Sequence, residues 1–186
     1  MRNYLNIKIL ILTIGVVLIY SCDRSPSIEW EKKISWEVLQ EAMDIKQTND
    51  SGYIILGKNG FKPTLIKINS KGNTEWVKEF ADYNNKLPKV IQQTNDGGYI
   101  VVGSQGYGLD QNFWVSKLDK TADVIWSKEY DDGGNREEII AIECIEDGSY
   151  IIAGERLDVI DNIYSSDYWI ARIDNNGALS WSKVIG

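Results

Sequence analysis

Apolar and turn-forming residues recur along the chain in three similar stretches. Each begins with a turn rich in Asn, Asp and Gly and continues into a short apolar run that starts with tyrosine and ends with glycine. These runs are Tyr53–Gly57, Tyr99–Gly103 and Tyr150–Gly154. Short runs of Ile, Val and Tyr between such turns predict β-strands joined by tight reversals. The pattern therefore predicts an all-β fold built from an internal repeat.

The spacings separate a constant core from one variable segment per repeat. A tryptophan precedes each tyrosine of these runs by 23 or 24 residues. The tryptophans are Trp30, Trp76 and Trp126, and a fourth, Trp181, follows the third repeat. The glycine that ends the run lies 10, 14 or 18 residues before a basic residue near the end of a later strand, which is Lys67, Lys117 or Arg172. We therefore expect one loop per repeat to vary in length while the core stays fixed.

Each repeat predicts four short strands. In the third repeat they span about Glu138–Ile145, Ser149–Glu155, Asp167–Asp174 and Ala178–Ile185. A four-stranded antiparallel unit of about 40–50 residues is the blade of a β-propeller. Blades are predicted at about 38–80, 87–130 and 137–185, within a repeat region of 28–186 that starts with a leading strand at 28–34. The expected fold is a β-propeller-type array of about three blades plus one strand, an incomplete or open propeller. A β-sandwich or an open β-array is the alternative.

The first 22 residues carry an export pattern. Arg2 and Lys8 precede an apolar run of 12 residues, Ile9–Tyr20, whereas a membrane-spanning helix needs about 20. Length and flanks predict a secretory signal peptide over residues 1–21. The segment Ile19-Tyr20-Ser21-Cys22 resembles the lipobox of bacterial lipoproteins. This resemblance implies cleavage before Cys22, attachment of palmitate-type acyl chains to Cys22, and a tether over 22–27. A plain signal peptide or an uncleaved anchor is the alternative.

The amino-acid composition excludes several types of catalytic, metal-binding and nucleic-acid-binding site. The chain has no histidine, two cysteines and a formal charge of −7. Ser-His and Cys-His pairs, His-ligated zinc and Cys₄ sites are therefore excluded. An acidic chain without a basic run also lacks the footprint of a nucleic-acid binder. Removal of Arg2 and Lys8 with the signal makes the mature charge −9, so attachment to the membrane must come from the acyl chains. We predict no catalytic residue, cofactor or metal.

The repeats resemble those of secreted β-propeller lipoproteins of Bacteroidetes-type bacteria, whose pattern is T-x-D-G-G-Y-I-x-x-G, D-x-W-x-x-K-x-D and G-x-x-x-W-x-K. The corresponding segments are Thr94–Gly103, Asp167–Asp174 and Gly177–Lys183. This resemblance covers residues 28–186 and implies a propeller anchored in the cell envelope, which we expect at the outer membrane. It implies little about activity, because most members have none assigned.

The function hypotheses follow from this resemblance. The first is a non-catalytic, lipid-anchored module that binds or scaffolds a protein or a glycan at an unknown site. The alternatives are a quinoprotein-like enzyme fragment and a carbohydrate-binding, lectin-like protein. No match to quinoprotein calcium ligands or to the bulb-lectin motif Gln-x-Asp-x-Asn-x-Val-x-Tyr is found. Open blade edges also predict self-association or continuation by another chain.

Several repeated side chains have a structural and a functional interpretation. Similarity to quinoprotein propellers implies that Trp30, Trp76, Trp126 and Trp181 dock adjacent blades. The cations at 67, 117 and 172 are predicted to pair with aspartates, and an anion-binding basic ring is the alternative. The adjacent aromatic residues at 113–114 and 168–169 point to opposite sides of a strand. We expect one residue of each pair to pack between blades. The alternative is that it lines a surface on which sugars stack. The acidic segments at 131–135 and 158–167 are predicted to be solvated loops rather than calcium sites.

Overall fold

The computed structural model describes residues 10–11, 16–17, 40–59, 62–80, 85–161 and 163–186. The chain divides into two units, Met1–Glu31 and Lys32–Gly186, and each is described by itself. In the first unit, β1 (Leu10–Ile11) pairs antiparallel with β2 (Val16–Val17). None of the described residues forms a helix long and apolar enough to cross a membrane. The predictions for Cys22, the tether, the leading strand and Trp30 lie outside the described residues.

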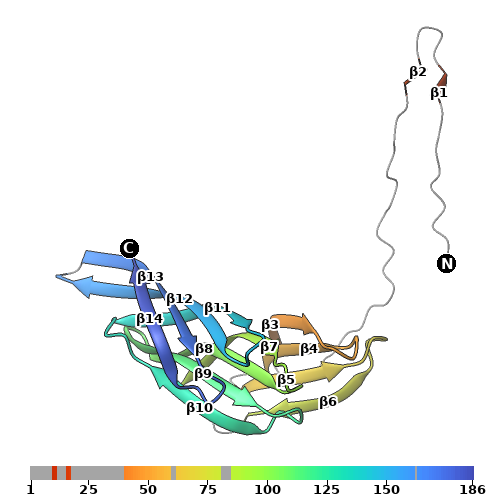
Figure 1. The fold of residues 1–186 in the computed structure, drawn as a ribbon, viewed down its shortest axis with the longest axis horizontal. Helices are drawn as coiled ribbons and strands as arrows, with labels where there is room; N and C mark the ends of the chain where they lie inside the picture. The colour runs from red at the N-terminus through yellow and green to blue at the C-terminus, as the bar shows by residue number, and fades with distance from the viewer. Residues whose placement is uncertain (1–9, 12–15, 18–39, 60–61, 81–84, 162) are drawn as a thin grey trace. The chain divides into compact units, whose positions relative to one another are not determined.

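The second unit contains three consecutive antiparallel meanders of four strands, which we name A, B and C (Figure 1). Meander A comprises β3 (Gln40–Gln47), β4 (Tyr53–Asn59), β5 (Lys62–Ile68) and β6 (Thr74–Glu79). Meander B comprises β7 (Lys86–Gln93), β8 (Tyr99–Tyr107), β9 (Asp110–Leu118) and β10 (Val124–Tyr130). Meander C comprises β11 (Arg136–Cys144), β12 (Tyr150–Ile160), β13 (Ile163–Ile173) and β14 (Leu179–Ile185). The prediction of an all-β fold is confirmed, since no described residue is helical.

Two hydrophobic clusters hold the meanders together. The first joins A to B and includes Leu56 and Leu65 of A with Val101 and Trp114 of B. The second joins B to C and includes Val102 of B. Because consecutive strand residues point to opposite faces, Val101 and Val102 enter different clusters. Meander B is therefore buried on both faces, and burial of apolar surface supplies most of the attraction between meanders.

The second and third strands of each meander lengthen from A to C. They have 7 residues each in A, 9 in B and 11 in C. The prediction of a variable loop is wrong, because the additional residues form strands, and β12 and β13 run well beyond the predicted limits at Glu155 and Asp167. Each step adds two residues to each strand. An even number preserves the inward and outward alternation of side chains, so the hairpin can grow without disturbing the core.

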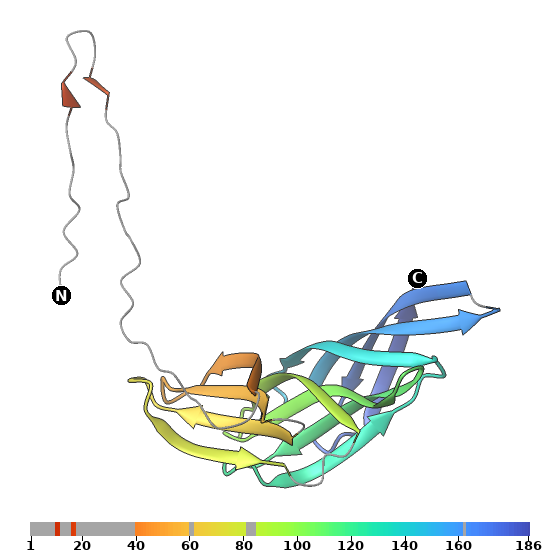
Figure 2. The same cartoon turned by 180° about the vertical axis from the view of Figure 1, so that it is seen from behind.

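The first strand of each meander has a β-bulge at the same place. The bulged residues are Met43, Lys89 and Ile140. Opposite each bulge stands the glycine that ends the apolar run, which is Gly57, Gly103 or Gly154. A Cβ atom there would collide with a backbone carbonyl oxygen of the bulged strand, so close approach of the backbones requires glycine. The first strands also lie near one another, β7 between β3 and β11 (Figure 2).

Candidate functional site

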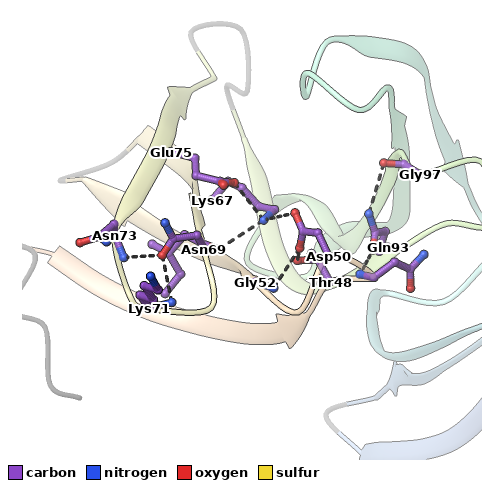
Figure 3. Close-up of polar contacts among 12 residues, drawn as sticks. Thr48, Asp50, Gly52, Lys67, Asn69, Lys71, Asn73, Glu75, Gln93 and Gly97 are labelled. Atoms are coloured by element: carbon purple, nitrogen blue, oxygen red, sulfur yellow. Dashed lines mark hydrogen bonds and ion pairs between the residues drawn. The ribbon is translucent and has the colours of Figure 1, made fainter. Parts of the chain in front are cut away.

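A buried lysine joins the turn between β3 and β4 to strand β6 in meander A (Figure 3). The side chain of Lys67 on β5 is buried, and its Nζ lies 2.8 Å from Asp50 Oδ2 and 3.1 Å from Glu75 Oε2. The other Asp50 oxygen accepts hydrogen bonds from Thr48 Oγ1 and from the Gly52 N–H. Asp50 therefore closes the turn between β3 and β4 and ties it to β5.

Meanders B and C repeat this arrangement. Lys117 Nζ lies 2.6 Å from Asp96 Oδ2 and also donates a hydrogen bond to Asn175 of meander C. Arg172 forms an ion pair with Asp147 and is more exposed than either lysine. The prediction of cations paired with aspartates is confirmed at all three positions. The alternative, an anion-binding basic ring, is wrong because a carboxylate neutralises each cation.

The paired aspartates have pKa values below the ordinary range of a carboxyl group. Partial burial acts to raise the pKa of Asp96, but hydrogen bonds from Lys117, Thr94 and Gly98 outweigh it and lower this pKa to about 2. A hydrogen bond from Lys67, followed by those from Thr48 and Gly52, lowers the pKa of Asp50. Burial acts to lower the pKa of Lys117, yet its hydrogen bond to Asp96 and its other partners give a net rise. These groups stay ionised near neutral pH and serve as structural pairs.

The tryptophans of A and B lie at the contacts with the next meander. Trp76 meets Tyr99 of meander B edge to face, with ring centroids 6.1 Å apart and planes at 71°. The indole N–H of Trp126 donates to the Asn175 carbonyl oxygen of meander C at 2.9 Å. Trp181 occupies the matching position of meander C and is 45% exposed. Trp30 lies outside the described residues.

The adjacent aromatic pairs separate as expected from strand geometry. Trp114 packs in the cluster between A and B. Its neighbour Phe113 stacks on Trp169 of meander C, with centroids 4.0 Å apart and planes at 17°. Tyr168, the neighbour of Trp169, is 68% exposed. Three of the four rings therefore pack between meanders, and Tyr168 alone of these four faces solvent.

A groove of about 320 Å³ lies where the first strands of the three meanders approach one another. The three bulged residues, Met43, Lys89 and Ile140, all line it. Two of its charged groups, Asp44 and Lys46, form an ion pair with each other, while Lys89 pairs with Glu138 at 2.6 Å. Its polar groups are therefore engaged within the protein.

The acidic segments are ordered by internal contacts. Arg156 pairs with Asp132 at 3.0 Å and with Asp158 at 3.3 Å. Glu137, which the sequence did not single out, is buried and accepts hydrogen bonds from the N–H groups of Asp132 and Gly134. Burial raises the pKa of this carboxyl despite these hydrogen bonds. Among the described residues, no group of three or more acidic or cysteine side chains is arranged to hold a metal ion.

A second groove, of about 150 Å³, lies across β11, β12 and β13 and was also missed. It is lined by Arg136, Glu138, Glu155, Leu157 and Ser166, and we name it the hairpin groove. Part of this groove, around Ser166, was predicted to be a solvated loop. The available signal was the alternation of Tyr164, Ser166 and Tyr168, which has the period of a strand.

The only thiol described does not have the properties of a nucleophile. Burial raises the pKa of Cys144 to about 11, so the sulfur is protonated at neutral pH. It lies 3.7 Å from the Gln93 carbonyl oxygen, to which it donates a weak hydrogen bond. A protonated, half-buried cysteine acts as a small packing residue.

Comparisons with known proteins give no family: no protein-family model matches this chain, and no curated protein matches it either.

Proposed function

We propose that this chain is a non-catalytic, lipid-anchored binding or scaffold module of the bacterial cell envelope, with its repeats arranged as blades of a β-propeller. The observation that supports a binding role is the increase in length, from meander A to meander C, of the hairpin formed by the second and third strands. One hairpin per meander lengthens by two residues per strand, while the turns, bulges and ion pairs of the core repeat. A constant core with variation confined to one element is typical of repeat proteins that bind ligands with that element.

The propeller arrangement is supported by the order of the strands. The first strand of meander B, β7, lies beside the first strands of A and C, and the fourth strand of each meander lies at its edge. Radial blades have this order, with first strands around a central axis. Trp76 and Trp126 would then dock each blade to the next one, as their contacts with Tyr99 and Asn175 suggest.

Lipid attachment rests on the sequence around Cys22, and its test is direct. Full-length protein and its Cys22→Ala variant are expressed in a Gram-negative host and partitioned between detergent and water. Wild type should enter the detergent phase with the mass of added acyl chains, and the variant should not. Equal partitioning of the two proteins would contradict the anchor.

Binding is tested in the same envelope with a photo-crosslinking amino acid. It is placed at Leu109 or Ile163, exposed residues at two hairpin ends, and as a control at Ile125, a residue of β10 whose exposure lies between theirs. Discrete adducts from the hairpin positions, but not from Ile125, are expected. If the hairpin positions give no adduct, or none beyond the control, the binding role is wrong.

A further inference from the structure

The long hairpin of meander C forms a surface that the other meanders lack. Beyond Leu157 on β12 and before Tyr168 on β13, the two strands pair only with each other in the described structure. This two-stranded ribbon carries Tyr164, which is 66% exposed, near its end. In hairpin B, Gln111 of β9 matches Ser166, but the position that matches Tyr164 is Leu109 in the turn between β8 and β9. The exposed strand position of Tyr164 is therefore present in hairpin C and not in hairpin B.

Cross-strand pairing places the hairpin groove and two tyrosines on one face. Arg136, Leu157 and Ser166 form one row of directly opposed residues. Residues opposed across an antiparallel pair lie on the same side of the sheet. Tyr164 and Tyr168 flank Ser166 at a spacing of two residues each way, so they share its face and lie about 13 Å apart along the strand.

The polar groups of the groove are held in place by neighbours. Ser166 donates a hydrogen bond of 2.6 Å to Glu155. Arg136 donates to Gln111 at 3.0 Å and to Glu138 at 3.1 Å. A guanidinium has five N–H donors and a carboxylate several lone pairs. Both groups thus retain capacity for further hydrogen bonds while their positions are fixed.

Charge narrows the class of ligand. Glu138 and Glu155 stand directly opposite one another, an arrangement that destabilises a sheet unless it is compensated. The cations Arg136 and Lys89 both pair with Glu138, so the four charges sum to zero. Such a groove has no net attraction for a polyanion or a polycation. It suits an uncharged ligand with many hydroxyl groups, and exposed tyrosines add flat apolar faces for contact.

We infer that the hairpin groove, with Tyr164 and Tyr168 on either side, is a binding site for a neutral oligosaccharide long enough to contact both rings. This site rests on the proposed binding function and gives it a ligand class. The tyrosines supply apolar contact area at low conformational cost, and the fixed Arg136, Glu155 and Ser166 supply hydrogen bonds to hydroxyl groups.

The test uses the full-length protein in detergent and neutral hexasaccharides of glucose, mannose and xylose. Anionic and cationic hexasaccharides of hyaluronan and chitosan serve for comparison. At least one neutral probe should bind, and Tyr164→Ala and Tyr168→Ala should each weaken it about tenfold. The matched control is Tyr107→Ala, which removes an equally exposed tyrosine at the end of hairpin B and should leave affinity unchanged.

Three results would overturn the site: no neutral probe binds, a charged probe binds more tightly, or binding survives loss of both tyrosines. Failure of this inference is distinguishable from failure of the proposed function. If the hairpin crosslinkers form protein adducts but no hexasaccharide binds, the oligosaccharide site is wrong and the proposed binding function stands. If there are neither adducts nor hexasaccharide binding, both proposals are wrong.

Discussion

Meanders B and C have an equivalent face that is covered by a neighbouring meander in B and exposed to solvent in C. In B, Phe113 is fully buried and Trp126 donates a hydrogen bond to meander C. In C, the residue matching Phe113 is Tyr168, and the residue matching Trp126 is Trp181; they are 68% and 45% exposed. Equivalent positions in a repeat therefore share backbone geometry without sharing burial. Their energetic roles should differ accordingly.

The largest difference is expected at the position of Phe113 and Tyr168. Phe113→Ala should lower the free energy of unfolding by about 3–5 kcal/mol, because it opens a cavity beside Trp169. Tyr168→Ala should change it by less than about 0.5 kcal/mol, because an exposed side chain buries little. Urea denaturation followed by circular dichroism measures both. Similar losses in the two variants would mean that the face of C is covered in solution.

A smaller difference is expected between the ion pairs of B and C. Asp96→Asn leaves the buried Lys117 ammonium without its carboxylate and should cost about 2 kcal/mol, a value reduced because Asp96 itself is half exposed. Asp147→Asn should cost less, since its partner Arg172 remains open to water. The urea midpoints of both variants provide the comparison. A greater loss in Asp147→Asn would contradict the importance of lysine burial.

The ion pair of Asp96 should also make the stability of the protein depend on pH in the acid range. The pKa of Asp96 is about 2 in the folded protein and lower than its ordinary value near 4. Its stabilising effect is therefore complete above about pH 4 and is lost as the pH falls from about 4 through about 2. Wild type should lose more stability than Asp96→Asn between pH 5 and pH 2.5, as measured by urea midpoints. Parallel losses would show that Asp96 is not coupled to folding.

The smallest effect is expected from the indole hydrogen bond. Trp126→Phe removes the donor to the Asn175 carbonyl and should cost about 1 kcal/mol, whereas Trp181→Phe should be nearly neutral. Calorimetry of thermal unfolding gives the difference. Equal melting temperatures for wild type and Trp126→Phe would indicate that water replaces the lost donor.

Much of the fold could be predicted because its signals are local. The Asn/Asp-Gly turns, the alternating apolar runs and the recurring glycine require only neighbouring backbone to act, and they led to an all-β repeat. The pairing of Lys67, Lys117 and Arg172 with aspartates was also predicted, because each cation and its turn recur in every copy. The hairpin groove was missed, since a polar, aromatic strand exposed to solvent resembles a loop in composition.

By itself, the sequence determined the repeat, the strand-forming segments, the turns and the paired charges, since each depends on residues close in the chain or on one recurrent pairing. Only the tertiary structure decided which copy of a position is buried. It placed Phe113 against Trp169 and left Tyr168 in solvent. It also brought Arg136 and Ser166 into one groove from separate strands. The reason is physical: periodicity along the chain sets the direction of a side chain, but burial depends on which distant element packs against it.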